Sequence, residues 1–123
     1  MNDSPDESVS LLSENDPCGD DWSESSLLGV LMEERLFSEE GYTDLEASML
    51  GAVSEGLDFQ TLGAIIRVVE RMTLLFRRHV DPGDDYRIEN LDDEQVAELD
   101  RRVRFCLLEI SLGNAPDMSR WEV

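Results

Sequence analysis

Residues 58–79 read DFQTLGAIIRVVERMTLLFRRH, and this stretch decides the fold. Its apolar side chains recur at helical spacing and cover more than one face of a helix. They are Leu62, Ile65, Ile66, Val68, Val69, Met72, Leu75 and Phe76. Asp58 is suited to cap the first turn, and Pro82-Gly83 disfavours continuation. The sequence therefore predicts a central helix from Phe59 to about His79.

A second strong helix is predicted after this break. Asp92 followed by Gln95 forms a capping box, and Leu91 is placed to pack against Val96. Apolar residues then alternate at spacings of three and four, as on a helix packed nearly parallel or antiparallel to a neighbour. They are Val96, Leu99, Val103, Cys106 and Ile110. Gly113-Asn114 ends this helix, and Pro116 prevents its resumption.

Two weaker helices are expected earlier in the chain. One spans about 23–37 and is weakened by Gly29. The other begins at Thr43, because Thr43-Asp-Leu-Glu46 also has the form of a capping box, and it ends at Gly56.

No segment alternates apolar and polar residues long enough to predict a strand. We therefore expect an all-α fold, a small bundle of about four helices formed by residues 22–114. Residues 1–21 are acidic and poor in apolar residues, which predicts a flexible arm with one small apolar island, Val9, Leu11 and Leu12. Residues 115–123 form a short C-terminal tail.

The charge is strongly one-sided. The chain has 123 residues, 29 Asp plus Glu against 10 basic residues, and a formal net charge of −19. All ten basic residues are Arg, which is typical of a G+C-rich coding source or of a high-salt proteome. This charge argues against binding to nucleic acid or anionic lipid, because phosphate contacts require cations. Partners should be proteins with basic or neutral surfaces.

The sequence also predicts a cytoplasmic protein. The first ten residues have no basic segment typical of a signal peptide, and no apolar run approaches the ~18 residues of a membrane span. Cys18 and Cys106 lie far apart in sequence, one in the acidic arm and one in a helical pattern, which favours reduced thiols.

Catalytic and metal-binding motifs are weak. The single histidine, His79, stands at a helix C-terminus, where the helix dipole alone favours a cation. A loop with four acids, Asp81, Asp84, Asp85 and Glu89, allows weak divalent binding or simply a solvated turn. We expect no enzymatic activity, no cofactor and no resident metal.

Eight of the ten arginines fall between residues 67 and 104. They form either one basic strip or a set of local partners for neighbouring acids. Glu98 and Arg102, and likewise Asp100 and Arg104, have the spacing of ion pairs one turn apart on a helix.

One short stretch resembles a known family. Residues 10–21, SLLSENDPCGDD, are similar to the segment that opens the N-terminal domain of TssA-like (ImpA-type) components of type VI secretion, and the similarity stops at Trp22. In that family the segment introduces a helical domain that serves assembly of a contractile apparatus. The resemblance implies a structural adaptor.

We hypothesise that the chain is a non-enzymatic interaction module whose carboxylates dock on a basic protein surface, as in inhibitors, immunity proteins and DNA mimics. The expected contacts are Glu33, Glu34, Glu39, Glu40, Asp84, Asp85, Asp92, Asp93 and Glu94.

Two alternatives stay open. The first is a structural or regulatory adaptor that oligomerises, for example as a homodimer, through apolar helix positions. The residues predicted for helix packing or for such an oligomer surface are Leu74, Val96, Leu99, Val103, Leu108 and Leu112. The second is a small regulatory protein of a halophile, whose acidity is an adaptation to concentrated salt.

Overall fold

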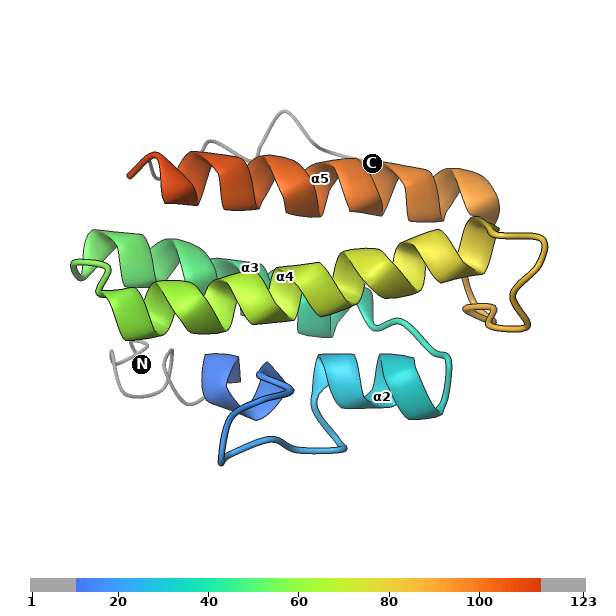
Figure 1. Ribbon diagram of the computed structural model, residues 1–123, viewed down its shortest axis with the longest axis horizontal. Helices are drawn as coiled ribbons and strands as arrows, with labels where there is room; N and C mark the ends of the chain where they lie inside the picture. The colour runs from blue at the N-terminus through green and yellow to red at the C-terminus, as the bar shows by residue number, and fades with distance from the viewer. Residues whose placement is uncertain (1–10, 114–123) are drawn as a thin grey trace.

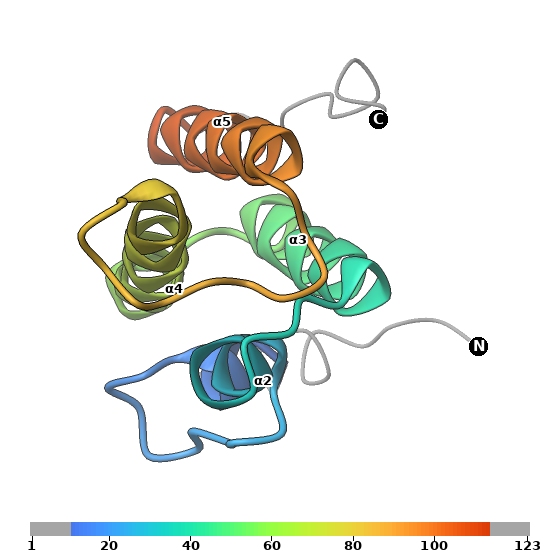
Figure 2. The ribbon, with the colours of Figure 1, turned by 90° about the vertical axis from the view of Figure 1, so that its right-hand side faces the viewer.

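A computed structural model describes residues 11–113 of the chain, and this part contains helices and no strands. Helices α3 and α4 lie side by side in a middle layer, with α5 on one side and α2 on the other (Figures 1 and 2). The expected small all-α bundle is thus confirmed for these residues.

Helix α4 spans Phe59–Val80, and its start is the predicted one because the Asp58 side chain accepts a hydrogen bond from the Thr61 amide. Most of the predicted apolar side chains are buried against the other helices, with Ile65, Val68 and Met72 fully inaccessible to solvent, whereas Ile66 is 40% exposed. The chain leaves the helix at Asp81, before Pro82-Gly83.

Helix α5 spans Asp93–Ser111 and begins with the predicted capping box of Asp92 and Gln95. It runs antiparallel to α4 (Figure 1). The apolar seam faces inward, with Val96, Val103, Cys106 and Ile110 buried. Gly113 follows it at φ +82, a left-handed conformation that glycine adopts at low cost.

Helix α3 spans Glu39–Ser54, and its capping residue lies five positions before the predicted Thr43. Ser38 is its cap, accepting a hydrogen bond from the Gly41 amide, and Glu39 and Glu40 favour this start because acids stabilise a first helical turn. Thr43 therefore lies inside the helix and donates to the Glu39 carbonyl. The predicted end is confirmed, since Gly56 has φ +96.

Helix α2 spans only Leu27–Glu33, less than the predicted 23–37. Ser26 caps it, and Arg35 at φ +61 turns the chain out of the helix. Gly29 is required by close packing, because a Cβ there would lie 2.5 Å from the Glu24 carbonyl oxygen.

The predicted flexible arm needs correction for residues 11–21. Residues 11–15 are helical, and Leu12, Asn15 and Asp16 are buried. Asn15 accepts a hydrogen bond from the Leu28 amide, which fixes this segment against α2. The packed part therefore begins ahead of residue 22. Residues 1–10 and 114–123, with Val9, Pro116 and the whole predicted tail, lie outside the described residues.

Candidate acidic docking surface

Two loops far apart in sequence are held together at one end of the bundle. The Asn90 side chain accepts from the Phe37 amide at 2.9 Å and donates to the Phe37 carbonyl at 2.7 Å. The Glu89 amide donates to the Arg35 carbonyl at 2.8 Å. These contacts join the α2–α3 connection to the α4–α5 connection at the end that faces the viewer in Figure 2.

Tyr86 anchors the α4–α5 connection from within. Its hydroxyl donates to the Leu31 carbonyl at 2.6 Å, and its ring lies 5.6 Å from the Arg35 guanidinium and 5.0 Å from that of Arg78. Burial raises the pKa of Tyr86 to about 12, so it stays a neutral donor.

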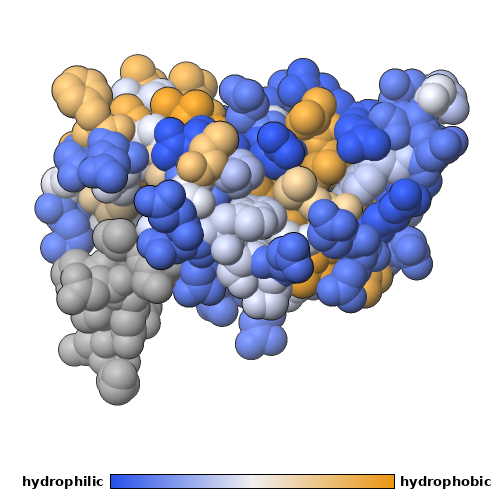
Figure 3. Space-filling model, turned by 60° about the horizontal axis from the view of Figure 1, so that its bottom comes forward, coloured by the Kyte–Doolittle hydropathy of each residue, from blue (hydrophilic) through white to orange (hydrophobic). Residues whose placement is uncertain are grey.

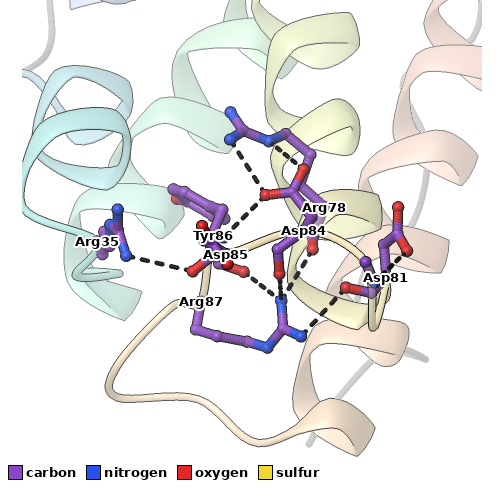
Figure 4. A network of polar contacts seen from close by, with 8 residues as sticks. Arg35, Arg78, Asp81, Asp84, Asp85, Tyr86 and Arg87 are labelled. Atoms are coloured by element: carbon purple, nitrogen blue, oxygen red, sulfur yellow. Dashed lines mark hydrogen bonds and ion pairs between the residues drawn. The ribbon is translucent and has the colours of Figure 1, made fainter.

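The arginines at this end bond to the chain itself (Figure 4). Arg78 pairs with Asp84 at 2.9 Å, and these hydrogen bonds lower the pKa of the Asp84 carboxyl. Arg87 donates to the carbonyl oxygens of Asp84 and Asp81 at 2.7 and 3.1 Å. Arg87 thus fixes the backbone of the loop through carbonyl oxygens. Among these contacts, only Arg78 neutralises a carboxylate of the loop, that of Asp84.

His79 joins α4 to α5. Its ring is buried, Nδ1 accepts from the Ile88 amide at 2.8 Å, and Nε2 lies 2.9 Å from Asp93 Oδ1. Because Nδ1 accepts, the ring proton is on Nε2 and points to Asp93. The expected position at the helix C-terminus is confirmed, and the ring ties that terminus to the next helix.

The structure brings the nine predicted carboxylates to helix ends and loops around these contacts. Three have partners inside the chain: Asp84 binds Arg78, Asp92 caps α5 and Asp93 contacts His79. The others are exposed, as is Glu89, which the prediction of docking residues left out. We define the acidic end as the exposed carboxylates Glu33, Glu34, Glu39, Glu40, Asp85 and Glu89, which precede α5 in the chain; Glu94 is exposed on α5 itself.

The predicted oligomerisation residues divide into two groups. Val96 and Val103 are buried within the chain and Leu99 is partly buried, so these three serve helix packing, one of the two predicted roles, and do not form an oligomer surface. The reason is that the seam of α5 packs on α4 of the same chain. Leu74, Leu108 and Leu112 are 44%, 56% and 65% exposed.

Of the two arrangements expected for the arginines, the structure shows local partners for most of them. Six of the eight arginines between residues 67 and 104 bond to carboxylates or carbonyls of their own chain. The Asp100–Arg104 pair is confirmed at 2.8 Å. The Glu98–Arg102 pair is wrong, since Glu98 binds Arg101.

Arg102 instead reaches α3, where it forms two hydrogen bonds to Glu46 at 2.9 and 2.7 Å. The Tyr42 hydroxyl donates to the same carboxylate at 2.8 Å. Burial raises the pKa of Tyr42 well above its usual value and that of the neighbouring Cys106 thiol to about 12. The sequence did not predict this buried cluster, because Arg102 lies 56 residues from Glu46.

A polar hollow of about 560 Å³ lies between residues 12–21 and the first half of α4. At one wall Asp16 accepts two hydrogen bonds from Arg67, while the exposed Cys18 and Asp58 line other parts. The expected free thiols are confirmed, because Cys18 and Cys106 are not joined. Within residues 11–113 no three His, Cys, Asp or Glu side chains are grouped to hold a metal ion, the acidic loop 81–89 included.

No helix in the described part of the chain is both long and apolar enough to cross a bilayer. In comparisons with known proteins, no family model, curated protein or solved structure matches the chain.

Proposed function

We propose that the protein is a non-enzymatic, cytoplasmic interaction module that docks its acidic end on a basic surface of a protein partner. The observation that carries this proposal is the separation of charge. Outside α4 and α5, the described residues hold eighteen carboxylates and two arginines. A carboxylate surplus on one side attracts a basic partner over long range and orients its approach.

The geometry of the acidic end supports this function. Asn90 and Glu89 hold the two loops together, so carboxylates from α2, α3 and the 81–92 connection share one rigid base. A preformed array loses little conformational entropy on binding. Such an array can bind a basic protein surface that otherwise binds DNA or other acidic ligands. Inhibitors and DNA mimics act in this way.

The test compares two variants with the same loss of charge. One replaces Glu33, Glu34, Glu39 and Glu40 with Gln. Its matched control replaces Asp20, Asp21, Glu24 and Glu55, all exposed and outside the acidic end, with Asn or Gln. Circular dichroism checks that both keep the wild-type helicity.

Wild type and control should retain a basic partner from a lysate of the source cells, and the acidic-end variant should lose it. With the purified partner, affinity should fall at least about tenfold between 50 and 300 mM KCl, because salt screens exposed charges. Duplex DNA should compete if the module mimics nucleic acid. Equal binding by all three proteins, or binding that salt does not change, would reject the proposal.

A second candidate function is a structural adaptor within a larger assembly. It is favoured by the exposed large hydrophobic side chains of α4 and α5. Assembly through these residues would leave the acidic end free for another component.

A further inference from the structure

The surface formed by α4 and α5 differs from the rest of the molecule in both charge and polarity. Helix α4 carries four arginines and one glutamate, and α5 carries three arginines and five carboxylates. The two helices together are therefore nearly neutral. Within residues 11–113, six of the seven exposed large hydrophobic side chains also lie on these helices or at the C-cap of α5: Phe59, Ile66, Leu74, Val80, Leu108 and, at the cap, Leu112.

Part of this apolar surface gathers at one end. Phe59 is 94% exposed at the first residue of α4, and Leu108 and Leu112 stand one turn apart near the end of α5. Figures 1 and 2 place the start of α4 and the end of α5 at the same end of the bundle. In Figure 3 hydrophobic residues cluster at the upper left, over this end.

We propose that this face binds a second copy of the chain. The two-fold axis runs parallel to the helices and lies outside the chain, over the groove between α4 and α5. In that arrangement α4 of each copy packs against α5 of the other, antiparallel, and the four helices form a bundle. Mutual repulsion of two chains of charge −19 disfavours contact through the acidic side, so the neutral face is where two copies can approach.

The register of the helices gives this pairing self-complementary charges. Contact of His79 with Asp93 sets the level of α4 against α5, and both helices rise 1.5 Å per residue. Counting from that contact places Glu70 near the level of Arg104, and Arg77 near that of Glu94. Across the two-fold axis each acid of one copy then faces an arginine of the other.

The apolar residues match by the same count. Ile66 falls near the level of Leu108, and Phe59 near that of Leu112. Arg104 binds Asp100 within its own helix but remains 63% exposed, so its guanidinium has donors left for Glu70 of the second copy. Arg77 forms no ion pair with another described residue. Both charge pairs are thus available.

Sedimentation equilibrium of the full chain tests the proposal, with reducing agent present because the exposed Cys18 can form disulfides. Wild type should form dimers in the micromolar range. Leu108→Glu should be monomeric, and Leu36→Glu, at an exposed leucine between α2 and α3, should dimerise normally. A wild type that stays monomeric up to about 0.5 mM, or equal behaviour of the two variants, overturns the proposal.

A charge exchange tests the pairing itself. Glu70→Arg alone and Arg104→Glu alone should each weaken the dimer by about tenfold or more, because like charges then face each other. The double exchange should restore it to within about threefold. A double variant as weak as either single variant rejects this arrangement. The acidic-end variant should dimerise normally, which separates a failure here from a failure of the proposed docking function.

Discussion

Asp16 accepts two hydrogen bonds from Arg67, from Nε at 2.9 Å and from Nη2 at 2.7 Å, across 51 residues of sequence. The Asp16 side chain is almost fully buried, while that of Arg67 is 42% exposed. The pair therefore attaches the segment that follows the helical residues 11–15 to the middle of α4.

Loss of this pair should release residues 11–21. We expect Arg67→Ala to lower the free energy of unfolding by about 1–2 kcal/mol, because it leaves a buried carboxylate with fewer donors. Chemical denaturation measures the loss, and hydrogen exchange should accelerate at the amides of residues 11–18. Arg71→Ala is the control, since no ion pair joins Arg71 to another described residue. Unchanged exchange in Arg67→Ala would contradict the anchoring role.

The same pair predicts a pH dependence. Hydrogen bonds from Arg67 hold the pKa of Asp16 below its ordinary value of 3.8. A carboxyl that is more acidic when folded stabilises the fold above its unfolded pKa, and the stabilisation is lost as the pH falls through the lowered value. The stability difference between wild type and Arg67→Ala should thus be constant from pH 7 to 5 and shrink below pH 4. A difference that grows in acid would show that the sign is wrong.

The link between α3 and α5 gives a comparison of neighbouring arginines. The side chains of Glu46 and Arg102 are 6% and 20% exposed, whereas Arg101 and Glu98 pair at the surface. Arg102→Ala leaves Glu46 buried without its cation and should cost about 3 kcal/mol. Arg101→Ala should cost less than about 1 kcal/mol. Urea denaturation of both variants measures this difference, and equal losses would refute the structural role of Arg102.

The Asp16–Arg67 and Glu46–Arg102 pairs also show which contacts a sequence pattern cannot predict. Asp58, Asp92 and Gly56 were predicted as helix boundaries because capping and left-handed turns depend on a few adjacent residues. The predicted helix start at Thr43 is wrong, because Ser38 caps the helix instead. Glu46, predicted as the acid of the capping box, binds Arg102. Asp16–Arg67 and Asn90–Phe37 join residues more than fifty positions apart, and local periodicity contains no information about such contacts.

For the core, a charge at Val103 should prevent folding. Val103 is fully buried in the seam between α5 and α4, so Val103→Asp places an unpaired carboxylate among apolar groups. We expect a loss above about 4 kcal/mol, comparable with the whole stability of a small domain. Leu108→Asp, at a 56% exposed position of the same helix, is the control and should retain its helicity. Far-ultraviolet circular dichroism distinguishes the two, and a normal melting curve for Val103→Asp would refute the seam.

A salt series decides whether the acidity serves binding or adaptation to concentrated salt. The carboxylates buried in the fold have arginine partners, as Asp16 has Arg67 and Glu46 has Arg102, so folding does not need salt to screen them. The surplus acids are exposed and confined largely to the α2, α3 and loop side, and their repulsion should lower the melting temperature only modestly at low ionic strength. We therefore expect the same helicity by circular dichroism in 10 mM and 2 M KCl. A chain that is unfolded in 10 mM KCl and folds only in molar salt would instead identify its acidity as solvent adaptation, and the docking proposal would lose its physical basis.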